Sequence, residues 1–509
     1  MSFGTPTNFG YYTSGGALTT ISSFQQVANN GFFGPNLGFD ATGDYDLYWK
    51  GTTDGTWNGT QNNWTTDEAG AHPALAFPDA LHGVFFAAAG AANLNTTLGA
   101  DFSVGRVKFT TASAVTIGGG HVLTLGVWGI TVDSGSGAHT IDCPLALGSN
   151  QIWANASGNP LTINGALSGT GALELNGGST ILSGNNSARP AAVDNKTIVN
   201  NGTTLQLQAN AGNTVAGISY ALSAEQTGGR PLNLSHGATL QLRSDSDVIF
   251  AGGNNLGGLG RATVTLDVNQ LTAGNSNRTI TLAPAGFITL ATTINVEGGS
   301  GYTLCLGNIT EGREQPLTFN ANTANLSVDK IGITRRVTSL TVGGAANTTL
   351  GQLVSTTTDS TLTKTGTGTL TISRANTYKG TTTVSGGTLR LAATDTLSLA
   401  STNLLNGGTL DCGAFTNHLG TLTVAGGVTS TLRIDVGGAL SFADSSAVAW
   451  NGSVNIEGAL AATSLRFGSS GMALTVEQLR AMRYCGNRVG IDANGYIFEQ
   501  ERGTRISFH

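Results

Sequence analysis

Charged side chains are the scarcest feature of this 509-residue sequence. Asp, Glu, Lys and Arg make up 11% of it, against about 25% in ordinary soluble domains. So few ionisable groups leave few candidates for acid–base catalysis. The net charge is −6 and the Lys and Arg residues are scattered. The sequence therefore lacks the basic stripe that neutralises phosphates, and we expect no nucleic-acid partner.

Long apolar runs are also missing. The most apolar segment, residues 74–92, is interrupted by Pro78, Asp79 and His82, so we expect no transmembrane segment. The residues after Met1 contain neither a basic segment nor an apolar run before a small-residue cleavage site. No signal peptide is visible there.

Cysteine and clustered histidine are rare as well. The four cysteines lie at least 73 residues apart, which fits neither a zinc site nor a dense disulfide framework. We expect small buried hydrophobic residues at Cys143, Cys305, Cys412 and Cys485. The seven histidines contain no HExxH pair, so we predict no metal site and no cofactor.

The nearest candidates for a functional acidic cluster are residues 43–46 (GDYD) and 244–247 (SDSD). Neither cluster has the glycine and terminal glutamate of a calcium loop, so we interpret both as solvated turns. Asp435 beside Arg433 is interpreted as a strand-surface pair. We predict no catalytic residues, although carboxylates that converge from different parts of the fold would still make a polysaccharide-cleaving enzyme.

Glycine, in contrast, is abundant, with 74 residues. Many glycines belong to a recurring unit in which an Asn/Ser-Gly turn precedes an alternating Thr-Leu-x-Leu strand. Copies are LELNGGSTIL at 173–182, NNGTTLQL at 200–207, SHGATLQL at 235–242, SGGTLRL at 385–391 and NGGTL at 406–410. Alternation of this kind predicts strands with one buried face, and Gly and Asn suit the tight turns between them.

These repeats predict an all-β fold, a right-handed parallel β-helix (β-solenoid) over residues 93–470. Each coil buries its inner face only by stacking on its neighbours. Thr388 and Thr409, 21 residues apart in the last two copies, are expected to lie one coil apart. At about 20 residues per coil and about 4.8 Å between strands, the rod would be roughly 90 Å long.

The N-terminal segments differ from the repeats. Residues 1–45 form an aromatic arm, and residues 46–92 form a Trp-rich module in which Trp49, Trp57 and Trp64 make a small aromatic core or stack on sugars. The arm either folds back as a cap or docks on a neighbouring subunit. The predicted assembly residues of the arm are Phe3, Phe9, Tyr11, Tyr12, Phe24, Phe32, Phe33 and Phe39.

At the other end, residues 471–509 are predicted to form a C-terminal cap. Residues 475–484 (TVEQLRAMRY) favour a short helix, with a capping box in Thr475 and Gln478 and apolar Leu479 and Met482 three residues apart. Such a helix would cover the strand edges of the last coil or form part of a joint between subunits.

Residues 361–391 resemble the passenger-associated transport repeat of bacterial autotransporter-type proteins. The resemblance lies in Lys-Thr-Gly-x-Gly-x-Leu, Ala-Asn-Thr-Tyr, Gly-Thr-Thr-x-Val and Gly-Thr-Leu, in this order. Residues 167–207 carry a weaker copy, and residues 48–64 and 475–498 are similar to the opening and closing segments of such proteins. The resemblance implies a β-solenoid exported to the cell surface or beyond. Only about forty residues follow Phe467, too few for the C-terminal membrane barrel of autotransporters.

The sequence thus favours a non-enzymatic extracellular structural protein that assembles with itself into a filament or surface layer. A second hypothesis is an adhesin that binds surface glycans through one face of the solenoid. The polysaccharide-cleaving enzyme is a third. Thr-rich strips such as residues 381–383 raise a further alternative, binding to ice or carbohydrate through an array of hydroxyl groups.

Overall fold

The computed structural model describes residues 10–12, 18–20, 46–58, 61–74, 77–186, 196–209, 232–255, 262–285, 292–310, 316–333, 339–355 and 360–500. The chain divides into two compact units, Met1–Asp44 and Tyr45–His509. In the first unit, β1 (Gly10–Tyr12) pairs antiparallel with β2 (Leu18–Thr20). The second unit holds all the other elements.

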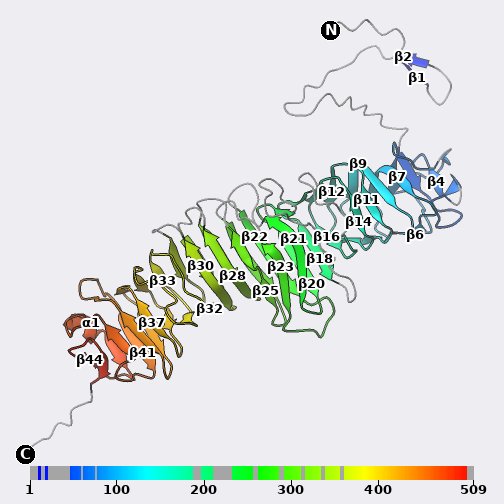
Figure 1. Cartoon of the computed structure of the whole chain (residues 1–509). Helices are drawn as coiled ribbons and strands as arrows, with labels where there is room; N and C mark the ends of the chain where they lie inside the picture. Colours follow the sequence, from blue (N-terminus) through cyan, green and yellow to red (C-terminus); the bar gives the residue numbers. More distant parts are fainter. Residues whose placement is uncertain are drawn as a thin grey trace, which may run out of the picture. The chain divides into compact units, whose positions relative to one another are not determined.

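The second unit is a parallel β-solenoid of about 14 turns, as the sequence predicts. Its coils follow one another in chain order along one axis (Figure 1). One side of the coils, face A, is a parallel sheet to which each coil contributes a single strand. Its strands are β6 (Asn95–Thr97), β8 (Thr116–Gly118), β10 (His139–Ile141), β13 (Leu161–Ile163), β16 (Ser179–Leu182), β18 (Thr204–Ala209), β20 (Thr239–Ser244), β22 (Ala262–Asn269), β24 (Thr292–Gly298), β27 (Leu317–Ala321), β29 (Ser339–Gly343), β31 (Thr361–Lys364), β33 (Thr382–Val384), β35 (Asn403–Leu405) and β38 (Leu422–Val424).

The second side, face B, bends round a corner of the coils, since one long strand there pairs with two short strands of the next coil. Its strands are β3 (Asp46–Trp49), β4 (Trp64–Thr65), β5 (Gly83–Phe86), β7 (Phe102–Phe109), β9 (Leu123–Val132), β11 (Leu145–Leu147), β12 (Gln151–Asn155), β14 (Leu167–Gly169), β15 (Leu173–Asn176), β17 (Thr197–Val199), β19 (Leu232–Leu234), β21 (Val248–Asn255), β23 (Thr279–Ala285), β25 (Thr303–Cys305), β26 (Asn308–Thr310), β28 (Asn325–Ile333), β30 (Thr348–Ser355), β32 (Thr369–Ile372), β34 (Thr388–Leu391), β36 (Thr409–Asp411), β39 (Thr429–Ile434), β41 (Ser453–Gly458) and β43 (Met482–Tyr484).

The last coils add a third sheet, face C, made of β37 (Thr416–Leu419), β40 (Ala439–Phe442) and β42 (Leu465–Phe467). The C-terminal cap contributes α1 (Val476–Arg480) and the antiparallel pair β44 (Val489–Ile491) and β45 (Ile497–Glu499). A single 3-10 turn, η1 (Gln61–Asn63), lies near the start of the unit. No helix in the described part of the chain has the length and apolar character needed to cross a membrane.

One continuous hydrophobic core runs through the solenoid, from Leu47 to Ile497. The alternation read from the sequence places leucine inside at every second position. In β20, for example, Leu240 and Leu242 are fully buried while Gln241 is half-buried. Because parallel pairing is in register, like residues stack on like, and Thr388 lies opposite Thr409 as expected.

The predicted length of the rod is wrong, because the coils are not uniform. Thr363 pairs with Thr383, 20 residues further on, but Thr204 pairs with Thr239, 35 residues further on. About 14 turns at about 4.8 Å give a stack of roughly 65 Å. The extra residues lie between strands and add no rungs.

The Trp-rich module begins the stack. Trp49, Trp57 and Trp64 are fully buried, and the ring of Trp64 lies edge-on to the other two at centroid distances of 5.0 and 5.2 Å. They form the expected aromatic core and present no surface to a sugar. Thr56 bridges to Thr97, the last residue of β6, so this module covers the first edge of face A.

The last edge of face A is covered by Trp450, which precedes the C-terminal cap. Trp450 bridges to Val424 of β38 and its Nε1 donates to the carbonyl of Leu422 at 2.6 Å. The predicted helix is present but ends at Arg480 rather than at Tyr484. Residues Met482–Tyr484 pair with β41 instead. Burial of Met482 against the last coil outweighs the weak tendency of a short helix to continue.

Candidate functional surfaces

The outer side of face A carries a ladder of threonines. On six consecutive strands, from β22 to β33, one outward position is always threonine, and successive members are partners in the parallel register. All six are half-buried. They are Thr263, Thr293, Thr318, Thr341, Thr363 and Thr383. The register of this ladder is not visible in the sequence, because the coils differ in length.

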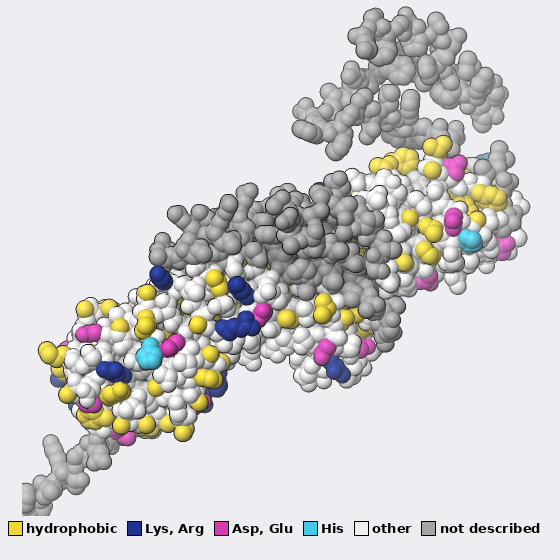
Figure 2. All heavy atoms as spheres, in the orientation of Figure 1, with side chains coloured by type: hydrophobic (Ala, Val, Ile, Leu, Met, Phe, Trp, Pro, Cys, Tyr) yellow, Lys and Arg dark blue, Asp and Glu magenta, His cyan; other side chains and the backbone are white. Residues whose placement is uncertain are grey.

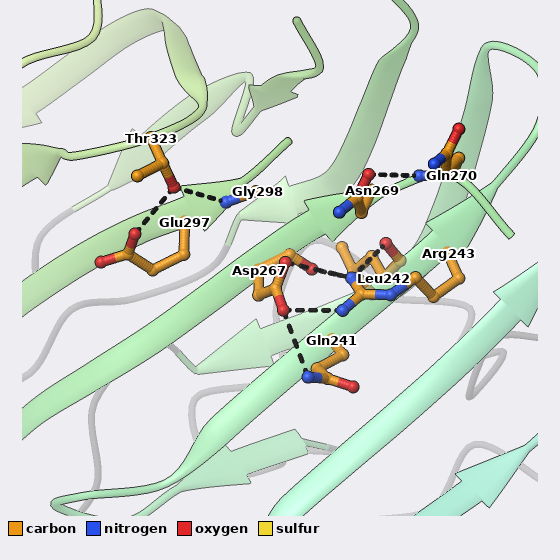
Figure 3. A network of polar contacts seen from close by, with 9 residues as sticks. All are labelled: Gln241, Leu242, Arg243, Asp267, Asn269, Gln270, Glu297, Gly298 and Thr323. Carbon is orange, nitrogen blue, oxygen red and sulfur yellow. Dashed lines mark hydrogen bonds and ion pairs between the residues drawn. The ribbon is translucent and has the colours of Figure 1, made fainter. Parts of the chain in front are cut away.

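Next to this ladder, separate groups of polar contacts each join two neighbouring coils (Figure 3). The Asp267 carboxylate accepts from both Arg243 Nη atoms, at 3.1 and 2.6 Å, and from Gln241 Nε2 at 3.2 Å. On the following strand Glu297, the register partner of Asp267, accepts from Thr323 Oγ1 at 2.8 Å. Both carboxylates are occupied by structural hydrogen bonds.

The two acidic clusters found in the sequence make structural contacts, the second to backbone amides and the first to an arginine side chain. Asp245 accepts from the amides of Leu271 and Thr272 at 2.9 Å each. Burial alone would raise the pKa of Asp245, but these hydrogen bonds and one from the Thr272 hydroxyl bring it below its ordinary value. In the first cluster, Asp46 is bound to Arg106 at 2.8 Å.

Arg433 and Asp435 lie 3.7 Å apart, as a surface pair. Arg390 lies between two carboxylates, 3.6 Å from Asp411 and 3.7 Å from Asp435. Across the described ranges, no group of three or more His, Cys, Asp and Glu side chains is placed to hold a metal ion. Figure 2 shows the same sparseness, with charged side chains scattered over a mostly uncharged surface.

His139 is an exception among the histidines because it is buried. Its ring stacks on Phe109 at 4.3 Å, and its Nδ1 accepts from the amide of Val115 at 3.2 Å. Its Nε2 has no hydrogen-bond partner. Burial lowers the pKa of His139 to about 4, so the ring is neutral at physiological pH.

The cysteines behave as expected at two of four positions. Cys143 and Cys412 are fully buried, and burial raises the pKa of each thiol to about 12. Cys305 is half-buried. Cys485 is exposed, so the prediction of a buried residue is wrong there. It lies in the turn after β43, where the backbone has φ 45°.

Of the predicted assembly residues, Tyr11 and Tyr12 belong to β1, paired with Thr19 and Leu18 of β2. The other members of the set lie outside the described residues. They are Phe3, Phe9, Phe24, Phe32, Phe33 and Phe39.

The predicted cap residues lie together at the end of the stack. The Thr475 hydroxyl accepts from the amide of Gln478 at 3.2 Å, and the Thr475 amide donates to Gln478 Oε1 at 2.7 Å, which is a capping box. Gln478 Nε2 also donates to the carbonyls of Ser445 and Val448. Leu479 packs against the core.

The residues of the Ala-Asn-Thr-Tyr motif join neighbouring coils. Buried Asn376 accepts from the amide of Leu353 in the preceding coil at 2.5 Å and donates to the carbonyl of Thr396 in the following coil at 2.8 Å. The Tyr378 hydroxyl, fully buried, bonds with that of Thr382 at 2.7 Å. The motif therefore works as a clamp between coils.

The lysine of the same repeat is buried. Lys364 occupies an inward position between Val342 and Val384, and its Nζ donates to the carbonyls of Thr365, Gly366 and Gly386. Burial lowers the pKa of Lys364 to about 8. Three carbonyls of one corner satisfy the three ammonium donors, so the lysine closes a corner rather than binding a ligand.

Sequence reasoning missed one exposed apolar surface on face B. Between β7 and β9 the register shifts, so that residues 126–128 lie opposite Gly105 alone. This bulge turns Val127 and Trp128 outward, 62% and 54% exposed. The sequence does indicate a bulge at residues 123–132 (LTLGVWGITV), because two glycines interrupt the alternation of apolar and polar residues there.

The exposed surface continues over the next coils. Val127, Ile152 and Ile198 line a shallow groove of about 390 Å³ with Glu174 and Lys196. On the preceding coil, the Arg106 guanidinium of β7 lies 5.9 Å from the centroid of the Trp128 ring and 4.5 Å from that of the buried Phe85 ring. We refer to Arg106, Val127, Trp128, Ile152 and Ile198 as the Trp128 strip.

Taken together, the described residues form a charge-poor parallel β-solenoid whose polar side chains mainly hold coils to one another, the architecture of a surface or passenger-type protein. Residues 362–391 match the family model of the passenger-associated-transport-repeat. The match contains the clamp and the buried lysine, and it indicates a secreted or surface protein. Comparisons with curated proteins and with solved structures gave no match.

Proposed function

We propose that this chain is a non-enzymatic, extracellular structural subunit that assembles with itself through its N-terminal arm into a filament or surface layer. The observation that carries the proposal is that the polar side chains of the repeat motif form hydrogen bonds within the stack. Asn376, Tyr378 and Lys364 all bond to their own or adjacent coils, and so the match supports a stiff stack rather than a reaction site.

The covered ends of the stack favour the arm over direct stacking of solenoids. The Trp-rich module covers the first edge of face A, and Trp450 covers the last edge. An uncovered edge would invite pairing with another chain. Contacts between subunits are then left to the arm, whose aromatic side chains would be buried on a neighbour.

Electron microscopy of the full chain and of a variant lacking residues 1–40 tests the proposal. We expect extended polymers or layers for the full chain and separate particles for the variant. Unchanged polymers in the variant would refute the role of the arm. Separate particles for both proteins would refute self-assembly itself.

The threonine ladder favours a second function, an adhesin that binds glycans. Six hydroxyls in register at about 4.8 Å present a regular array to a sugar polymer. Co-sedimentation with insoluble cellulose and chitin tests this, with Thr341→Val as the variant. The matched control is Thr423→Val on β38, because the register partner of Thr423 is Leu404 and not a threonine. Equal sedimentation of both variants would exclude the ladder.

A further inference from the structure

The Trp128 strip is a built surface rather than an accident of packing. A Cβ at Gly105 would overlap the Trp128 ring carbons, and one at Gly129, where φ is +59°, would overlap the carbonyl oxygen of Ile152. Glycine at these two positions therefore allows the bulge and the ring to lie flat on the preceding strand. Bulges of this kind re-aim side chains, and here they expose two large apolar groups.

The apolar side chains of the strip lie together. Other large apolar side chains are exposed elsewhere in the described ranges, such as Val436 at 84% and Met472 at 83%, but Val127, Ile152 and Ile198 line one groove. Val127, Trp128 and Ile152 come from two successive coils and are 62%, 54% and 46% exposed. Contiguous exposed apolar side chains on a soluble surface mark a site of interaction.

We propose that the Trp128 strip is the acceptor surface for the N-terminal arm, residues 1–45, of a second copy of this chain. The inference rests on the proposed function and adds the site to it. The arm contains nine aromatic residues and neither Lys nor Arg. Its rings match an apolar groove, and the Arg106 guanidinium, already 4.5 Å from one ring centroid, offers its edge to another.

Charge and length are compatible with this occupant. The ionisable side chains of the arm include Asp40 and Asp44 and no cation, so nothing in the arm repels Arg106 or Lys196. Forty-five residues reach at most about 150 Å when extended. This exceeds the length of the stack, and an arm can thus reach the strip of an adjacent subunit.

Tryptophan fluorescence of the full chain provides the test. All six tryptophans lie in the described residues, and Trp128 is the one exposed; Trp450 is half-buried and the other four are buried. The arm has no tryptophan. Acrylamide quenching therefore reports mainly on Trp128, and quenching should decrease as protein concentration rises and subunits assemble.

Three results are distinguishable. Protection that grows with concentration supports the proposal. Protection that is complete at every concentration means that the strip is covered within one chain, and it overturns the proposal. Full quenching of Trp128 in assembled material also overturns it, since the strip is then open to some other partner such as a glycan.

A pair of matched substitutions completes the design. Ile152→Ser removes an apolar group from the strip, whereas Ile249→Ser changes an isoleucine of similar exposure, 56%, on β21. We expect the first to raise the concentration at the midpoint of assembly about tenfold and the second to leave it unchanged. Equal midpoints would overturn the inference.

The proposed function can survive that failure. If the variant lacking residues 1–40 does not assemble while Ile152→Ser does so normally, then the arm binds another surface. If the full chain stays monomeric at every concentration, the proposed function is itself wrong.

Discussion

Polar side chains inside the coils tie each coil to the next. Asn376 does so in the repeat match, and Asn417 does the same two coils later, where its Oδ1 accepts from the amide and hydroxyl of Thr396 at 2.9 Å. Buried backbone groups that lose such partners are costly, because they have given up water. We therefore expect single asparagines to matter more than single surface charges.

Replacing Asn376 with Ala should lower the free energy of unfolding by about 1–3 kcal/mol, since the buried amide of Leu353 loses its partner. The carbonyl of Thr396 keeps a partner, because the backbone amide of residue 376 also donates to it at 3.0 Å. Urea unfolding followed by circular dichroism measures this. Thr367→Ala, at an exposed position of the same repeat, is the control and should change little. Equal effects of both variants would contradict the clamp.

His139 makes stability depend on pH. Its pKa is about 4 in the folded chain and about 6.5 when unfolded. Between these values the unfolded chain binds the proton and the folded chain does not. Stability therefore falls as pH decreases from 6.5 to 4, by at most about 3 kcal/mol, and this contribution is absent above pH 6.5.

Urea unfolding at pH 7 and at pH 4.5 gives the free energy of unfolding at each pH, and the difference between the two values checks this. The difference should be smaller in His139→Leu than in the unmodified chain, and unchanged in His236→Leu. His236 is a matched control, because it also accepts a backbone hydrogen bond, from Thr263 at 3.1 Å, but is exposed. If His139→Leu leaves this difference in the free energy of unfolding unchanged, the His139 ring does not stay neutral in the folded chain.

At the scale of strands and corners, the backbones of neighbouring coils come into direct contact at some glycines, with no side chain between them. At Gly368 a Cβ would overlap the carbonyl oxygen of Ala346 in the preceding coil, whereas at Gly158 there is open space. Neither glycine has a left-handed φ. The two positions therefore differ in the distance to the next coil and not in backbone strain.

Gly368→Ala should destabilise the chain by about 2 kcal/mol or more, because a backbone carbonyl must move to make room. Gly158→Ala should be neutral or raise stability by about 0.4–1 kcal/mol, because it restricts the unfolded chain. Thermal unfolding of both variants measures the difference. Equal midpoints would mean that coils are not in close contact at this corner.

The strands and their inward residues could be predicted from the sequence because alternation and Gly/Asn turns are local patterns. The pairing of Thr388 with Thr409 followed from equal spacing in the last repeats. The threonine ladder could not be found in this way, since coil length varies from 19 to 35 residues and register depends on the whole stack.

Local patterns failed in two further ways. The end of α1 was misplaced because Met482 gains more from pairing with β41 than from the helix. Trp128 was missed because a bulge reverses which side of the strand a residue faces, and a bulge is set by both strands together. The candidate binding surface was thus less predictable than the fold.

At the scale of the whole molecule, low charge is the main property. The second unit is a stack held by apolar burial and backbone hydrogen bonds. Most ion pairs in its described ranges have side chains open to solvent, as Arg374 and Asp329 do, and Figure 2 shows charged side chains scattered over a mostly uncharged surface. Surface pairs contribute little and are screened by salt. Stability and assembly should therefore respond weakly to ionic strength.

Raising NaCl from about 50 mM to about 500 mM shortens the screening length several-fold, but we expect the mass of assembled material to stay the same or increase. An apolar interface is not weakened by screening. Static light scattering measures the mass. Disassembly in high salt would show that ionic contacts hold the subunits, and would contradict an aromatic arm on an apolar strip.

The mass of the full chain in solution, measured by light scattering over a wide range of concentration, tests the central claim most directly. The account predicts a mass that rises with concentration well above the 51.7 kDa of one chain. A constant mass of 51.7 kDa at every concentration would contradict it.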